Sequence, residues 1–161
     1  MLDADAVECL FVSDEVRRFL VRPRFGGTYK GPKQMTLYRF LGAGGFGVPI
    51  GRVDVTDANL DGLKASIYEL GSSGAKYVGH TFFGAVQLGT GWDHQIGYVV
   101  PGNGDIYAGE AIARIRVGRV DKNGDIGGRD HQGQEAKVGY VRPPGTLDHM
   151  GAAALLLGLL K

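Results

Sequence analysis

From residue 37 onward the chain alternates short apolar stretches with glycine-rich turns, and one apolar–glycine pair recurs at similar spacing. The pair is an aliphatic residue followed directly by glycine, and successive glycines are 28, 18, 21, 21 and 19 residues apart. The six copies are Ile50-Gly51, Val78-Gly79, Ile96-Gly97, Val117-Gly118, Val138-Gly139 and Leu157-Gly158. Self-similarity of this kind indicates a repeat architecture in which each copy is one small structural unit.

A second apolar box lies upstream of each of these glycines. The boxes are Leu37-Tyr38, Ile67-Tyr68, Val86-Gln87, Ile106-Tyr107, Ile126-Gly127 and Leu147-Asp148. Turn sequences separate the units, and Asn103-Gly104 and Asn123-Gly124 can supply the positive φ angles of tight hairpin turns. Each unit is therefore predicted to be strand, turn, strand, turn.

The predicted fold class is all-β: an antiparallel array of about six β-hairpin units over residues 37–161, with a short helix before it. A lone hairpin is marginally stable, so each unit must bury its apolar face against its neighbours. This favours either a closed, petal-like ring with pseudosymmetry or a flat stack. The repeated glycine lacks a Cβ and so permits a bulge or the close approach of another group, and we expect it near the crowded centre or at a bend.

The pattern Gly-x-Ile-Tyr, a few turn residues, and then Val-Gly-x-Val runs, for example, from Gly104 to Val120. It resembles the short repeats of bacterial β-flower proteins, whose pseudosymmetric hairpins radiate about an axis. The resemblance covers residues 37–160. It implies a compact all-β repeat module and transfers no catalytic residue to this chain.

Residues 1–36 do not repeat and are predicted to form a basic arm. Ser13 is a candidate N-cap and Pro23 a stop for a short helix near residues 14–21. Between residues 17 and 39 the charged residues are all basic: Arg17, Arg18, Arg22, Arg24, Lys30, Lys33 and Arg39. We interpret the segment as a solvated arm that covers the β array or a neighbouring subunit. The alternative is a site for nucleic acid or another polyanion, because basic residues interleaved with aromatic ones can follow a phosphate backbone.

Composition and charge bear on whether the chain folds, which partners it attracts and where it is located. Glycine is 28 of 161 residues while the hydrophobic fraction is 43%, which is typical of a turn-rich folded chain. The formal net charge of +1 gives no whole-chain field that would favour nucleic acid or an anionic membrane. The single Cys9 cannot close an intramolecular disulfide. The first residues lack the basic region of a secretory signal. The apolar stretch at 151–160 is too short for a membrane helix. We expect a cytoplasmic protein without a membrane span; the alternative is export by a signal-free route or assembly into a particle.

Three of the four histidines follow an aspartate directly, as Asp93-His94, Asp130-His131 and Asp148-His149. Imidazoles and carboxylates that converge can bind a metal or transfer protons. The candidate ligands are His94, His131, His149, Asp130 and Asp148. The competing interpretation is polar turns, because adjacent residues of a strand point to opposite faces.

Two further features have competing interpretations. Residues 121–125 place side-chain oxygens at alternate positions, as calcium loops do, but Ile126 stands where such loops have glycine, and an Asn-Gly hairpin turn is favoured. Trp92 could stack on a sugar or base, and the alternative is packing in the core or between repeats.

Together these patterns predict a non-catalytic structural or interaction module that self-assembles or docks on a protein partner and needs no cofactor. The unpaired edges of an open array and the basic arm motivate the expectation of a homo-oligomer. The alternatives are a metal-dependent binder or small enzyme that uses the Asp-His pairs, and a polyanion-binding protein that uses the arm.

Overall fold

The computed structural model describes residues 29–41, 46–56, 63–109, 114–130 and 132–160. The chain divides into two compact units, residues 31–56 with 63–161, and residues 1–30 with 57–62. The first unit is the β domain. The second lies almost wholly outside the described residues, as does the helix predicted near residues 14–21.

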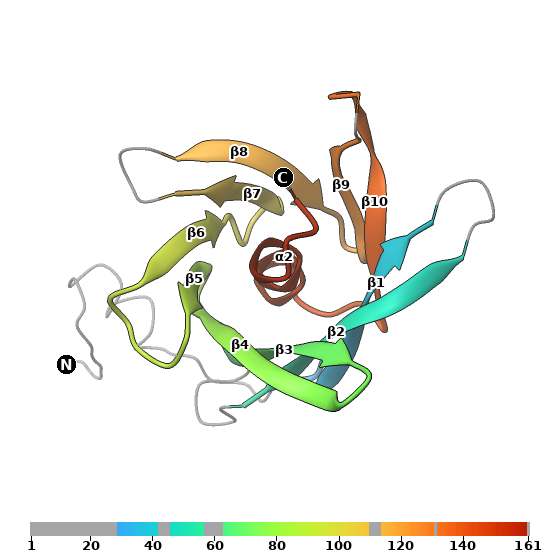
Figure 1. Ribbon diagram of the computed structural model, residues 1–161. Coiled ribbons are helices and arrows are strands. Elements are labelled where there is room, and N and C mark those ends of the chain that lie inside the picture. Colours follow the sequence, from blue (N-terminus) through green and yellow to red (C-terminus); the bar gives the residue numbers. More distant parts are fainter. Residues whose placement is uncertain (1–28, 42–45, 57–62, 110–113, 131, 161) are drawn as a thin grey trace. The chain divides into compact units, whose positions relative to one another are not determined.

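Ten antiparallel strands close into a barrel, in which neighbours in sequence pair with one another and β10 pairs with β1 (Figure 1). The strands are β1 (Gln34–Phe40), β2 (Gly47–Val55), β3 (Lys64–Gly71), β4 (Gly74–Phe82), β5 (Ala85–Leu88), β6 (Gln95–Val99), β7 (Asp105–Ala108), β8 (Ile115–Val120), β9 (Asp125–Arg129) and β10 (Glu135–Arg142). The predicted all-β hairpin array is confirmed, and it takes the closed arrangement. Because the ring closes, the described strands leave no free sheet edge of the kind that was expected to drive assembly.

In every hairpin the upstream apolar box lies opposite the repeat glycine, as Leu37 opposite Gly51 illustrates. The five pairs are Leu37/Gly51, Ile67/Gly79, Val86/Gly97, Ile106/Gly118 and Ile126/Gly139. A register shift lies directly beside each pair, so the bulge expected near the repeat glycine is present in all five hairpins. The repeat in sequence is thus a repeat in hydrogen-bond register.

The turns between hairpins follow the Asn-Gly chemistry. Gly104 and Gly124 have φ angles of 81° and 89°. Asp121 Oδ1 accepts hydrogen bonds from the backbone N–H groups of Asn123 and Asp125, at 2.9 and 3.0 Å. The carboxylate considered for a calcium loop therefore closes the turn between β8 and β9.

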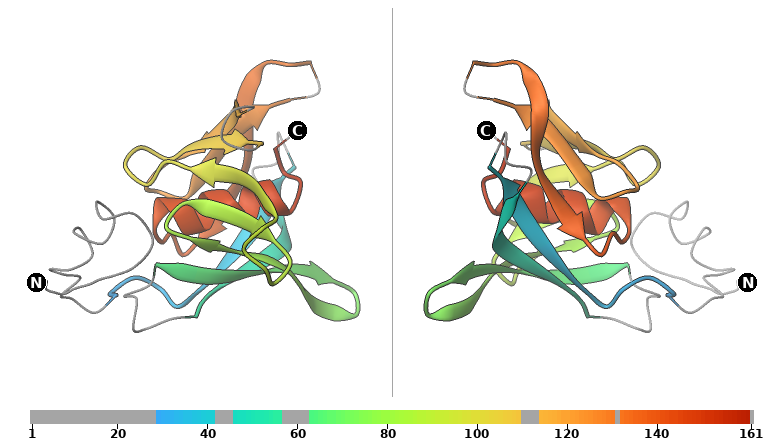
Figure 2. Two further views of the ribbon diagram at one scale, coloured as in Figure 1. Left: turned by 90° about the vertical axis from the view of Figure 1, so that its left-hand side faces the viewer. Right: turned by 90° about the vertical axis from the view of Figure 1, so that its right-hand side faces the viewer.

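The helix α2 (Leu147–Leu156) runs lengthwise inside the barrel (Figures 1 and 2). Its alanines at 152–154 are strong helix formers, and together with Met150 they are 0% exposed. Gly158 ends the helix with φ of 72°, and the N–H of Leu159 donates to Ala154 O at 3.0 Å, as in a Schellman cap. The sixth hairpin predicted from Leu157-Gly158 is therefore wrong: its glycine caps a helix, and the barrel has five hairpins.

The repeat glycines make room for the leucines that end and follow this helix. Leu155, Leu156, Leu157, Leu159 and Leu160 reach Gly97, Gly79, Gly51, Gly139 and Gly118, respectively, one in each hairpin. A Cβ on Gly118 would lie 2.8 Å from Leu160 Cδ2, and one on Gly139 would lie 2.7 Å from Leu159 Cδ2. The expectation that these glycines stand near the crowded centre is confirmed. A leucine side chain approaches each of them, and at four of the five, all except Gly51, a backbone oxygen of the neighbouring strand would also press on an added Cβ.

Candidate functional site

On the outside of the barrel, the residue after each repeat glycine faces a residue of the next hairpin. Arg52 lies opposite Tyr68, with its guanidinium 4.5 Å from the ring centroid. Tyr140 lies opposite Tyr38, and their rings stack with centroids 4.9 Å apart. The five pairs, which we name the outer row, are Arg52/Tyr68, His80/Gln87, Tyr98/Tyr107, Arg119/Gly127 and Tyr140/Tyr38.

Of the residues in the outer row, all of them described, Gly127 alone lacks a side chain, and a groove lies beside it. The strands β8 and β9 pair only through Arg119/Gly127 and Val120/Ile126, so they separate on one side of this contact. The groove has a volume of about 640 Å³, within the range of ligand sites. Its lining consists of Arg116, Arg119, Asp121, Asp125, Ile126, Gly127, Glu135, Ala136 and Lys137.

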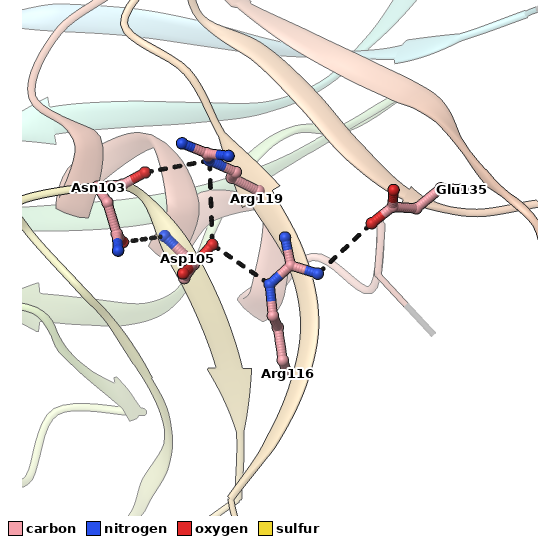
Figure 3. Close-up of polar contacts among 5 residues, drawn as sticks. All are labelled: Asn103, Asp105, Arg116, Arg119 and Glu135. Atoms are coloured by element: carbon pink, nitrogen blue, oxygen red, sulfur yellow. Dashed lines mark hydrogen bonds and ion pairs between the residues drawn. The ribbon is translucent and has the colours of Figure 1, made fainter.

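The β8 wall carries two arginines held by carboxylates and a backbone carbonyl (Figure 3). Arg119 Nε donates to Asn103 O at 3.3 Å and lies 3.9 Å from Asp105 Oδ1. Arg116 donates from Nε to Asp105 Oδ1 at 3.2 Å and from Nη1 to Glu135 Oε2 at 3.4 Å. The hydrogen bond to Asp105 raises the pKa of Arg116 against the opposing effect of burial, and Glu135 adds to the rise. The Arg116–Glu135 pair links β8 to β10.

The opposite wall is organised around Asp125. Its Oδ1 lies 3.2 Å from Lys137 Nζ and 3.0 Å from Arg142 Nη2. Burial would raise the pKa of Asp125, but the hydrogen bonds and charges of Arg142 and Lys137 together lower it below its usual value. Lys137 Nζ also lies 5.3 Å from the centroid of the Tyr140 ring. Both walls therefore present cations whose positions carboxylates fix.

The sequence analysis did not predict this groove, although one copy of the repeat differs from the others at the position concerned. The second box reads Ile106-Tyr107 in the fourth hairpin and Ile126-Gly127 in the fifth. The glycine at 127 indicates a groove only once the structure shows that Gly127 faces Arg119 on the neighbouring strand.

Trp92 belongs to a small cluster at the tip of the β5–β6 hairpin and is 52% exposed. Its ring stands edge-on to His80 and Phe82, with centroid distances of 4.4 and 5.7 Å. Lys64 Nζ lies 5.2 Å from its centroid. Trp92 therefore packs one part against the barrel wall, on the preceding hairpin, and presents the rest to solvent. Stacking on a sugar or base stays a prediction.

His80 beneath this ring is 4% exposed. Its Nδ1 and the hydroxyl of Tyr77 both lie 3.0 Å from Gly89 O, and the two groups lie 3.1 Å from each other. His80 Nε2 is buried and has no hydrogen-bond partner among the described residues. The bonds to Gly89 hold the start of the loop that carries Trp92.

The large apolar side chains exposed to solvent share one end of the barrel. In an antiparallel meander the loops within hairpins lie at one end and the turns between hairpins at the other. We name the former the hairpin-tip end, and Figure 2 shows the tips of β3–β4 and β9–β10 at the end where α2 finishes. Among the described residues these exposed side chains, all in or beside hairpin loops, are Leu41, Phe46, Val48, Leu88, Trp92 and Ile115.

The structure puts the Asp-His pairs in different settings. His94 is exposed in the β5–β6 loop, and His131 lies outside the described residues. Asp130 Oδ1 accepts from the N–H groups of Gln132 and Gln134 at 2.9 Å and so closes the β9–β10 turn.

Asp148 and His149 are buried at the start of α2, inside the barrel, with His149 Nδ1 3.8 Å from Asp148 Oδ1. Over the described part of the chain, no three His, Cys, Asp or Glu side chains lie close enough together to hold a metal ion.

The basic arm is mostly outside the described residues, including Arg17, Arg18, Arg22 and Arg24. Lys30 and Lys33 are described, and both are exposed ahead of β1. Polyanion binding by the arm stays a prediction. Among the described helices, none combines the length and apolar character needed to cross a membrane.

The groove and the hairpin-tip end are thus two candidate binding surfaces among the described residues of the barrel. Neither a protein-family model, nor a curated protein, nor a solved structure matches this chain.

Proposed function

We propose that the protein is a non-catalytic interaction module whose hairpin-tip end binds the same end of a second copy of the chain. The observation that carries the proposal is that the exposed large apolar side chains of the described residues all lie in or beside hairpin loops, at one end of a closed barrel. Phe46 is 75% exposed, Ile115 68% and Trp92 52%, and they come from three different hairpins. Exposed apolar surface of this kind can be buried in an interface with another molecule.

The barrel presents these side chains on a preorganised scaffold. Phe46 and Ile115 stand at or beside the ends of strands, and Trp92 rests against His80. Little conformational entropy is therefore lost when they are covered.

A second copy of the chain is the favoured partner of the hairpin-tip end because the side chains at the tips can complement one another across a two-fold axis. Besides the apolar residues, they carry both signs of charge, Glu69 with Lys76 on the second hairpin and Arg129 with Glu135 on the fifth. A two-fold contact uses the same patch on both subunits, so apolar and oppositely charged groups on one face suit it.

The test is light scattering coupled to size-exclusion chromatography across micromolar concentrations. The wild type should give a concentration-dependent dimer. The triple variant Phe46→Ser, Trp92→Ser, Ile115→Ser should remain folded by circular dichroism and lose the dimer. The control Lys122→Ser alters an exposed residue at the opposite end and should dimerise like the wild type. A wild type that is monomeric at every concentration, or a triple variant that still dimerises, would overturn the proposal.

A further inference from the structure

We propose that the groove beside Gly127 binds an aromatic ring, the phenol of a tyrosine side chain in a partner polypeptide, between Arg119 and Lys137. The proposal concerns the side of the barrel and does not depend on the hairpin-tip end.

The outer row shows what the fold accepts at this position. The counterparts of Gly127 in the first, second and fourth hairpins are Tyr38, Tyr68 and Tyr107. The junction between the first and second hairpins gives the nearest parallel, since Arg52 on β2 covers the ring of Tyr68 on β3 as Arg119 on β8 would cover a ring above Gly127 on β9. The junction between the fourth and fifth hairpins keeps the arginine and omits the ring.

The neighbouring cations suit a ring better than a simple anion. Gly127 is in register with Arg119 on β8 and with Lys137 on β10, so two cations flank the vacant position. The face of an aromatic ring attracts guanidinium and ammonium groups. Asp105 and Asp125 already balance these cations, so an added anion gains less from the groove than a neutral ring does.

The backbone at Gly127 leaves the space open. A Cβ built there would meet only Ala136 O at 3.8 Å and Arg119 O at 3.9 Å, which are ordinary contacts. The repeat glycines differ, because a Cβ on Gly118 would lie 2.8 Å from Leu160. The absence of a side chain at Gly127 is therefore not demanded by packing. At the rim, the carboxylate of Glu135, which is 69% exposed, can accept a hydrogen bond from a phenol hydroxyl.

The experiment is an NMR titration of the full chain with N-acetyl-L-tyrosinamide. We expect saturable shifts of the Arg119, Ile126 and Gly127 amide signals at millimolar probe concentrations, as befits a single ring. N-acetyl-L-leucinamide should give no saturable shift. A probe that fails to saturate these signals, or a leucine probe that binds equally well, overturns the proposal. So does inorganic phosphate that shifts the same signals at lower concentration, since the groove would then be an anion site.

Variants locate the site. Gly127→Tyr should fill the groove with its own ring, abolish the titration and melt no lower than the wild type. Arg119→Lys keeps the charge but loses the planar guanidinium, and should weaken binding several-fold. Gly102→Tyr adds the same side chain in the β6–β7 turn, where a Cβ would meet nothing within 4 Å, and should leave binding unchanged. Undiminished binding by Gly127→Tyr, or a lower melting temperature for it, refutes the assignment. The triple variant of the hairpin tips should bind the probe normally, which separates this site from the proposed dimer contact.

Discussion

Replacing one repeat glycine by alanine tests whether that position must be glycine because a leucine of the C-terminal segment occupies the space of a Cβ. A Cβ on Gly51 would overlap Leu157 Cδ1, while the nearest backbone atom, Tyr68 O, would lie 3.2 Å away. Overpacking of this kind costs about 1–3 kcal/mol. Without the overlap, alanine in a strand would be favoured over glycine by about 0.5–1 kcal/mol. The Gly51→Ala variant should therefore be destabilised, and the leucine should be the cause.

The second substitution removes that cause. Leu157 is partly buried, so Leu157→Ala should cost about 2 kcal/mol, at the low end for leucine truncation. In this background Gly51→Ala should become neutral or stabilising. The two substitutions should thus be coupled by about 1–3 kcal/mol, which is the size expected for residues in direct contact.

Gly97 provides the matched control. A Cβ there would meet Leu155 Cδ2 and also the backbone oxygen Tyr107 O. A side-chain truncation cannot remove the backbone contact, so Leu155→Ala should not restore the stability of Gly97→Ala. Urea unfolding followed by circular dichroism gives the free energies, with equal m values required for the comparison. Additive effects of Gly51→Ala and Leu157→Ala, or full rescue at Gly97, would refute the proposed role of the leucines.

Two further predictions concern polar contacts. Because Arg142 and Lys137 lower the folded-state pKa of Asp125, its carboxylate stabilises the fold above the unfolded-state pKa of about 3.9, and this contribution is lost as the pH falls through the folded-state pKa. The difference in urea midpoint between the wild type and Arg142→Gln should therefore be largest near neutral pH and shrink in acid, and a difference independent of pH would contradict it. Tyr77→Phe removes the hydroxyl that donates to Gly89 O at 3.0 Å, and should cost about 1 kcal/mol and alter the fluorescence of Trp92, the single tryptophan. An unchanged urea midpoint and emission spectrum would show that this bond does not hold the loop.

The hairpins could be predicted from sequence because their determinants are local. Asn103-Gly104 and Asn123-Gly124 specify tight turns, and an apolar box on either side of a turn specifies two strands. The register was not predicted, and the structure shows that every upstream box lies opposite a repeat glycine. Closure was left as one of two arrangements, because it depends on whether the first strand meets the last, and no local signal reports that contact.

The sixth copy shows where local similarity misleads. A leucine followed by glycine suits a strand pair, yet it also suits the last turn of a helix, where glycine adopts a left-handed conformation. The alanines at 152–154 favour the helix, and enclosure by the barrel satisfies its apolar surface on every side. The ring of hairpins thus decides the conformation of the segment that fills it.

The helix and leucines that fill the barrel determine which of its surfaces remain available for binding. The axis of the barrel is occupied by α2, and the space beside each repeat glycine is occupied by a leucine. Asp148 and His149, two of the polar groups predicted to act in a site, are buried with that helix. Within the described residues, the surfaces that remain for binding are therefore the hairpin tips and the exposed part of the outer row, which includes the groove beside Gly127. In the outer row the departure from pseudosymmetry at Gly127 marks a binding position, because four hairpins show which side chains the fold places there and the fifth leaves that place open.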